Sequence, residues 1–312
     1  MTINLIIDAL EELAPPSLQE SYDNCGLLVG NSSMECKGII TSLDVTEAVI
    51  FEAIEKGCNL IVAHHPIIFK GLKKLNGKNY VERTIILAIK NNIAIYAIHT
   101  NLDNILQGVN HTIADKLGLH KREILLPKPS TLVKLFTFVP IDHAAKVRDA
   151  LFAAGAGNIG NYSECSYTSQ GEGTFKAGIG SDPYLGNIGE LHTEPEVKLE
   201  VILPVWLKSK VQKALRESHP YEEIAHEFIL LENVMQETGS GLLGHFSSPV
   251  PELEFMRMLK DLFKVPVIRH SPFVCKDIST VALCGGAGSF LVPNAIALNA
   301  DAFVTGDMKY HE

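Results

Sequence analysis

The segment NLIVAHHPIIFKG, residues 59–71, contains a short apolar run followed by two histidines. Its apolar run, 60–63, is short and rich in β-branched residues, which is typical of a strand buried on both faces of a sheet. The run ends on two adjacent histidines, His64 and His65. Pro66 then removes a backbone donor and fixes φ, which helps to end the strand. The sequence therefore places two imidazoles where a buried strand meets solvent.

Several other apolar runs end in the same way, on polar or glycine-rich clusters. These runs are KGIITSLDVT (37–46), NNIAIYAIHTNLDN (91–104), STVALCGGAGS (279–289) and ADAFVTGDMKYHE (300–312). Helical patterns lie between the first three strands, with apolar residues three and four apart in 46–57 and 79–92. This alternation predicts a layered α/β domain with a mostly parallel sheet. Parallel strands share one carboxyl edge, so the run ends at Asp44, His64 and Asp103 should converge.

A different order of elements interrupts this pattern between residues 131 and 233. The segment is predicted as strand, helix, two strands around Gly171 and Gly173, helix and strand. A βαββαβ order indicates a ferredoxin-like α+β insert. We therefore predict two domains: a discontinuous metal-binding domain from 1–130 and 234–312, and an insert domain from 131–233.

The composition bounds the function classes. The chain has 312 residues, 46% of them hydrophobic and 20% charged, and a net charge of −9, which disfavours a general nucleic-acid binder. No apolar run approaches the roughly 20 residues of a membrane span, and the N-terminus has no basic region of a signal peptide. The six cysteines form no Cys-x-x-Cys pair, as expected of reduced thiols. We expect a cytoplasmic protein without a membrane partner.

The histidine pair is the main candidate for chemistry. Neutral imidazole is a common ligand of zinc and its neighbours, although a bare pair is more often two ordinary loop histidines. The strand-edge position and Asp103, a hard oxygen donor in the next βαβ unit, favour the metal interpretation. Asp103 alone could equally cap a helix or turn. We predict a divalent-metal site of His64, His65 and Asp103, supported by three further candidates that would orient the ligands: Asp44, His99 and Thr100.

Three other features carry weaker signals. CGGAGS (284–289) could cradle an anion, but a tight turn is the better interpretation because no Walker lysine follows. Asp23 and Asn24 are interpreted as turn caps. Cys25, Cys58 and Cys284 are interpreted as core residues.

A set of motifs carries a resemblance to a known family. They are SYDNCGLLVG, SLDVT, AHHPIIFKG, HTNLDN, GVN, HPYEE, CGGAGS and GDMKYHE, in this order. The chain resembles the Nif-three-like proteins, also called GTP cyclohydrolase I type 2 homologs, over essentially its whole length. The motifs are very specific in combination.

That resemblance implies a toroidal homohexamer with two divalent metal ions in each subunit, whether zinc, iron, manganese or nickel. It implies an insert similar to the trimeric PII and CutA-like domains. By motif, His64, His65 and Asp103 become metal ligands, and no catalytic residue is assigned. The implied activity is metal-dependent hydrolysis of a nucleotide or phosphoester, of the GTP cyclohydrolase or phosphoesterase kind. The alternative is a non-catalytic metal-binding regulatory or scaffold protein, and both stay open.

The chain departs from the family pattern at its end. The resemblance implies a further histidine and glutamate ligand on a segment after GDMKYHE, whereas this sequence ends at Glu312. We expect either a shortened chain or a poorly held second metal.

Overall fold

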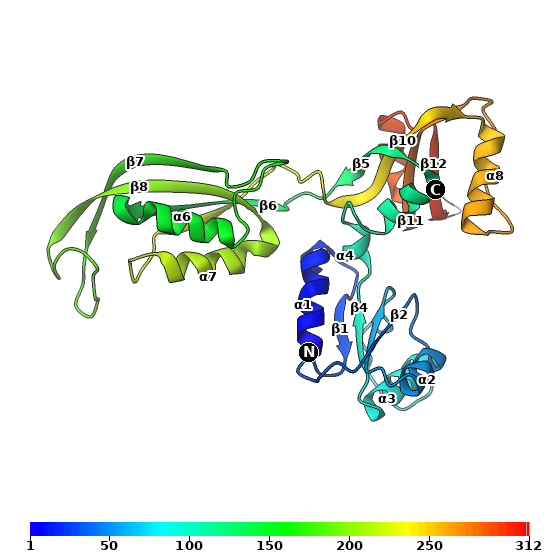
Figure 1. Ribbon diagram of the computed structural model, residues 1–312, viewed down its shortest axis with the longest axis horizontal. Coiled ribbons are helices and arrows are strands. Elements are labelled where there is room, and N and C mark those ends of the chain that lie inside the picture. Colours follow the sequence, from blue (N-terminus) through cyan, green and yellow to red (C-terminus); the bar gives the residue numbers. More distant parts are fainter. Residues whose placement is uncertain (310, 312) are drawn as a thin grey trace. The chain divides into compact units, whose positions relative to one another are not determined.

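The computed structural model describes residues 1–309 and 311 and divides into two compact units (Figure 1). Unit 1 comprises Met1–Pro127 and Gln236–Glu312, and unit 2 comprises Lys128–Met235. The predicted domain boundaries lie between residues 130 and 131 and between residues 233 and 234. Autonomous folding of unit 2 stays a prediction. Tyr310 and Glu312, at the end of GDMKYHE, lie outside the described residues.

The first sheet of unit 1 contains the histidine pair at one of its strand ends. Its strands are β1 (Gly26–Val29), β2 (Ile39–Ser42), β3 (Leu60–Ala63) and β4 (Ala94–Ala97), in the order β1-β4-β3-β2. β2, β3 and β4 are parallel, whereas β1 pairs antiparallel with β4. The carboxyl ends of the three parallel strands therefore share one edge.

Two helices make the crossovers between the parallel strands. They are α2 (Glu47–Glu55) and α3 (Tyr80–Lys90), while α1 (Ile3–Leu13) precedes the sheet. The Thr46 and Asn79 side chains cap α2 and α3 by accepting from backbone amides of their first turns. Apolar residues on one face of each helix pack against Ile61 and Ile95 of the sheet, and they are Ile50, Ala53, Ile85 and Ala88.

The second sheet of unit 1 is mostly antiparallel, which corrects the prediction of a mostly parallel sheet. Its strands are β5 (His120–Pro127), β10 (Gly239–Val250), β11 (Ile278–Ala287) and β12 (Ala302–Asp307), in the order β12-β11-β10-β5. Only β11 and β12 are parallel. The described sheets of unit 1 are therefore mixed rather than mostly parallel. An apolar run predicts that a strand is buried, but it does not predict whether the neighbouring strand is parallel or antiparallel.

Four helices accompany this second sheet. They are α4 (Thr100–Asp103), α5 (Val109–Leu117), α8 (Glu252–Phe263) and α9 (Val292–Ala297). Leu117 of α5 and Phe255 and Leu259 of α8 are buried against Leu242 and Leu283. The longest described helix, α8, has 12 residues, and none in the described chain has the length and apolar character of a membrane span.

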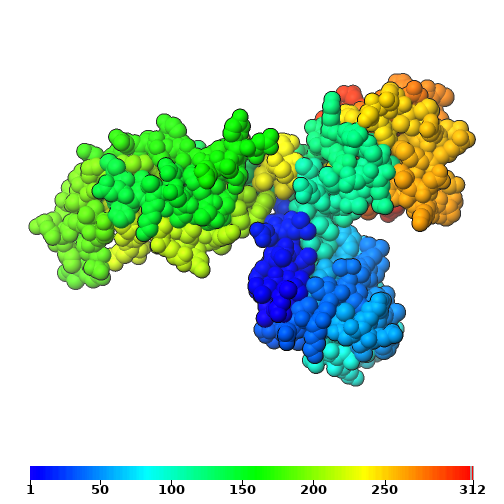
Figure 2. All heavy atoms as spheres, in the orientation of Figure 1, coloured from blue at the N-terminus to red at the C-terminus, as the bar shows by residue number. Residues whose placement is uncertain are grey.

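Unit 2 forms a separate core of its own side chains (green to yellow-green in Figure 2). Its elements are β6 (Leu132–Pro140), α6 (Ala144–Ala153), β7 (Ser166–Lys176), β8 (Leu191–Pro204), α7 (Lys208–Ser218) and β9 (His226–Leu230). The sheet order is β7-β8-β6-β9, and all three pairs are antiparallel. Alternate residues of LVKLFTFVP face the two helices, so Val133 and Leu135 are buried with Leu151 and Leu215.

Candidate metal centre

The candidate site lies at the carboxyl edge of the parallel strands. His64 and His65 directly follow β3, and His99 precedes α4 just after β4. Asp44 follows β2 by two residues. The chain thus delivers side chains from three successive strand ends to one place, as expected for an open α/β sheet.

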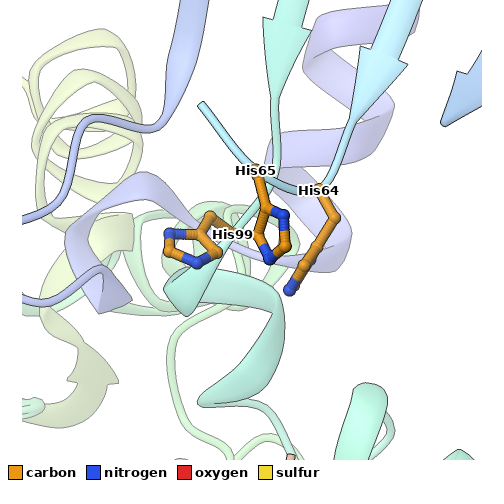
Figure 3. Close-up of side chains that lie close together, drawn as sticks. All are labelled: His64, His65 and His99. Atoms are coloured by element: carbon orange, nitrogen blue, oxygen red, sulfur yellow. The ribbon is translucent and has the colours of Figure 1, made fainter. Parts of the chain in front are cut away.

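Three imidazoles converge at this edge (Figure 3). The ring centroids are 5.1 Å apart for His64 and His65, 5.0 Å for His64 and His99, and 5.4 Å for His65 and His99. One ligand atom from each ring lies within 4.8 Å of the others. Two donors about 2.1 Å from one tetrahedral ion lie about 3.4 Å apart, so a small closing movement would let all three share an ion.

Each of the three rings already uses its Nδ1 atom. His64 Nδ1 lies 3.0 Å from the Ile98 carbonyl oxygen, His65 Nδ1 lies 2.8 Å from Asp44 Oδ1, and His99 Nδ1 lies 2.9 Å from Asp23 Oδ1. An oxygen acceptor at Nδ1 fixes the tautomer that carries the proton there. The Nε2 lone pairs are then the ones left to bind a cation.

Asp103, the predicted carboxylate ligand, lies beside this cluster at the end of α4. Its Oδ1 atom is 3.9 Å from His64 Nε2. Burial raises the pKa of the Asp103 carboxyl to about 6; the Asp23 carboxylate adds to that rise, whereas His99 and His65 oppose it. The Asp103 side chain is only 25% exposed, so its charge is costly without a cation at closer range, and a bound cation would remove that cost.

The structure also brings in a residue that sequence reasoning placed in a supporting role. His99, expected to orient ligands, is itself a member of the imidazole cluster. Asp44 does contact a histidine, as the expected orienting role requires. Thr100 instead contacts Asp23 through its hydroxyl and its amide.

Asp23 is the residue whose role sequence reasoning missed. Its side chain is fully buried and accepts hydrogen bonds from His99 Nδ1 at 2.9 Å, Thr100 N at 3.1 Å and Cys25 Sγ at 3.1 Å, and also from the Thr100 hydroxyl. Burial acts to raise the pKa of Asp23, but the bonds from His99, Thr100 and Cys25 outweigh it and hold the pKa well below its usual range. Asp23 is thus an anion that orients His99.

Two nearby thiols and the glycine loop have structural roles. Burial, followed by the Asp23 carboxylate, raises the pKa of Cys25 to about 11, and burial followed by Asp103 does the same for Cys284. Both thiols therefore stay protonated at neutral pH. The amides of Gly285 and Gly288 donate to Asn110 Oδ1 and Thr305 Oγ1, both at 2.8 Å, which fits the tight-turn interpretation of CGGAGS rather than an anion cradle.

The fold and the histidine cluster define a two-unit α/β protein with a candidate metal centre at a sheet edge. The chain belongs to the Duf34/NIF3 (NGG1p interacting factor 3) family, whose model matches residues 1–312. This confirms the resemblance that the motifs indicated.

Named relatives are similar over nearly the whole chain. A GTP cyclohydrolase 1 type 2 homolog of Halalkalibacterium halodurans is 42% identical over 98% of this chain and 82% of its own length. That of Bacillus subtilis is 38% identical with the same coverage. A crystal structure of a Bacillus cereus protein related to NIF3 superposes with a TM-score of 0.86 at 38% identity, covering 100% of this chain and 84% of that one.

Proposed function

We propose that the chain binds divalent metal through His64, His65 and Asp103, with His99 as a third imidazole donor, and that this centre hydrolyses a nucleotide or phosphoester. The observation that carries the proposal is the convergence of three Nδ1-anchored imidazoles within 4.8 Å. The relatives' name, GTP cyclohydrolase 1 type 2 homolog, supports a nucleotide as the substrate class.

The protonation of the cluster suits a cation. Burial, followed by the neighbouring His99 and His65 rings, lowers the pKa of His64, so its imidazole is neutral near pH 7. A neutral ring with Nδ1 bonded to a carbonyl presents an Nε2 lone pair without first losing a proton. Asp103 Oδ1, 3.9 Å away, adds the negative charge that a divalent ion needs.

The ion and the protein side chains would have different roles in hydrolysis. A bound divalent ion supplies Lewis-acid polarisation and a more acidic water, alone or as one of a pair. Asp44 and Asp23 hold His65 and His99 through Nδ1, which keeps both rings oriented with Nε2 available to an ion. We propose two ions per subunit, as in the sequence-based expectation.

The test begins with metal content. We expect the purified chain to retain zinc, iron, manganese or nickel after desalting, and His65→Ala to lose most of it. His120→Ala is the matched control, because His120 is an exposed imidazole in the same unit. Equal metal content in all three proteins would refute the site.

Activity distinguishes the enzyme from its alternative. Hydrolysis of GTP or of a phosphodiester that stops with chelator and returns with metal supports the hydrolase. A metal-loaded chain that hydrolyses none of these substrates would favour the regulatory or scaffold alternative.

We further propose that unit 2 is a ferredoxin-like, CutA-like insert and that six chains form one particle. The βαββαβ element order and the β7-β8-β6-β9 strand order support the first point. Light scattering of the purified chain should give about six times its mass of 34.1 kDa. A monomeric mass would refute the assembly.

A further inference from the structure

The loop between β3 and α3 carries a concentrated positive charge next to the histidines. Residues 66–79, PIIFKGLKKLNGKN, contain four lysines and no acidic residue, in a chain with a net charge of −9. The loop begins directly after His65. Its four lysines are exposed, and they are Lys70, Lys73, Lys74 and Lys78.

These four ammonium groups are not neutralised by neighbouring carboxylates. Within residues 1–309 and 311, none of them lies in an ion pair. Cations elsewhere on the surface do pair, such as Lys56 with Glu52 and Arg83 with Glu47. The loop therefore presents a positive field that no carboxylate offsets at ion-pair distance.

Both ends of the loop are fixed to the fold. The Ile68 carbonyl accepts a bond of 2.5 Å from Asn24 Nδ2. The Glu82 carboxylate accepts from the amides of Asn76 and Lys78 at 3.1 and 3.0 Å. The first bond ties the start of the loop to the turn before β1, and the other two tie its end to α3, so the loop is held at both ends.

Exposed aromatic rings lie at the same rim. Phe69 of the loop packs on Tyr22 with centroids 6.4 Å apart, and 46% and 64% of their surfaces are exposed. Partial burial raises the pKa of the Tyr22 phenol, and the carboxylates of Glu20, Asp23 and Asp103 raise it further. Tyr22 directly precedes Asp23, which accepts a hydrogen bond from His99, so the chain itself ties the aromatic pair to the histidine cluster.

We propose that the loop 66–79, together with Tyr22, is the recognition element for a nucleotide that carries a polyphosphate chain. The lysines contact the phosphates and the aromatic pair contacts the base. This inference rests on the proposed function, because it takes the reaction to occur at the adjacent metal centre.

The net negative charge of the chain gives a cationic loop a role in binding an anionic ligand. Asp23, Asp44 and Asp103 bring three carboxylates to the sheet edge, and the whole chain is acidic. Bound divalent ions would offset these three carboxylates, but the net charge of −9 on the whole chain still repels an approaching polyanion unless exposed cations lie on its path. Lysine serves here as a mobile point charge, and a planar aromatic surface is what a base stacks upon.

The test compares equilibrium binding of three probes to the metal-loaded full chain: GTP, guanosine and inorganic triphosphate. One variant replaces all four loop lysines by glutamine (K70Q, K73Q, K74Q and K78Q). The control replaces four exposed lysines elsewhere and so has the same net charge: K116Q, K146Q, K210Q and K260Q. We expect the loop variant to bind GTP about tenfold more weakly or worse, with a smaller salt dependence, and the control to bind like the parent.

The aromatic pair has its own readout. Tyr22→Leu with Phe69→Leu should weaken GTP binding while leaving inorganic triphosphate unaffected. Guanosine should bind the parent far more weakly than GTP. Metal content, measured on the same samples, should be the same in parent, loop variant and control.

Several results would overturn the proposal. They are equal GTP affinity in loop variant and parent, equal weakening in the control, or a parent that fails to bind GTP below about 1 mM. Loss of single-stranded oligonucleotide binding in the loop variant without loss of GTP binding would also overturn it. A parent that takes up no metal would, in contrast, refute the proposed function. The comparison of GTP affinity between parent, loop variant and control would still test the recognition element.

Discussion

At the scale of single residues, the site is organised by the Nδ1 atoms of its histidines. Each Nδ1 bonds to an oxygen from a different part of the chain, namely Ile98, Asp44 and Asp23. A sequence shows His64 and His65 side by side, but it does not show that Asp23 meets His99, 76 residues away. That contact follows from β1 pairing antiparallel with β4, which sets the segment before β1 beside the segment after β4.

The first prediction concerns Asp23→Asn. The amide cannot accept all the bonds that the buried carboxylate takes from His99, Thr100 and Cys25, so His99 loses its fixed tautomer. We expect the metal affinity to fall about 10–100-fold, measured by competition with a chromophoric chelator. Asp8→Asn, on an exposed turn of α1, is the control. Unchanged affinity in Asp23→Asn would mean that His99 needs no orienting partner.

The second prediction concerns Asp103 and pH in the metal-free chain. The pKa of Asp103 is about 6 in the folded chain, above its ordinary value of 3.8. Between about pH 4 and pH 6 the folded chain therefore keeps a proton on Asp103 that the unfolded chain has released. The stabilising contribution of this proton is fully present below about pH 4 and is lost as the pH rises through about 6. Asp103→Asn should therefore be more stable than the parent at pH 7, by about 1–3 kcal/mol, but not at pH 4.

Urea unfolding at the two pH values measures this difference. Asp261→Asn, an exposed carboxylate on α8, should show no such pH dependence. A parent as stable as Asp103→Asn at pH 7 would contradict the cost assigned to burying the Asp103 carboxylate.

At the scale of elements, the sequence predicts what is buried better than how strands are directed. The ends of the runs at Asp44, His64 and Asp103 are expected to meet if their strands are parallel. β2, β3 and β4 are indeed parallel. β5 and β10, which pair antiparallel, were not among the apolar runs from which the sheet was predicted. More than a hundred residues of chain separate these two strands, and local periodicity cannot predict so distant a pairing.

The third prediction concerns the glycine that lets β1 approach β4. Gly30 has φ +101°, and a Cβ there would lie 2.7 Å from the Ala94 Cα atom. Gly30→Ala should therefore cost about 2–4 kcal/mol of unfolding free energy and, because β1 positions Asp23, should also weaken metal binding. Gly71→Ala is the control, since a Cβ there meets no atom within 4 Å. Equal stability of the two variants would show that β1 can shift without cost.

At the scale of the whole chain, the sequence shows where the α/β pattern is interrupted, because the order of helices and strands changes there. In the structure the interrupting segment is unit 2, Lys128–Met235. The strand order of the second sheet in unit 1 was not visible, since it depends on distant pairings such as that of β5 with β10. The two points where the chain leaves and re-enters unit 1 are close neighbours. Pro127 at the end of β5 pairs with Gly239 at the start of β10.

The last prediction follows from that pairing. Removing Lys128–Met235 and joining Pro127 directly to Gln236 leaves only residues 236–238 between two strands that are already paired antiparallel. Three residues are a common length for a β-hairpin connection, so the join should close without strain. The core of unit 1 has its own buried clusters, and the metal candidates all lie within it. We expect a folded chain that keeps the parent's metal affinity, and an excised unit 2 that unfolds cooperatively by itself. Circular dichroism and metal titration of both pieces test this, and a shortened chain that fails to fold would show that unit 1 depends on its insert.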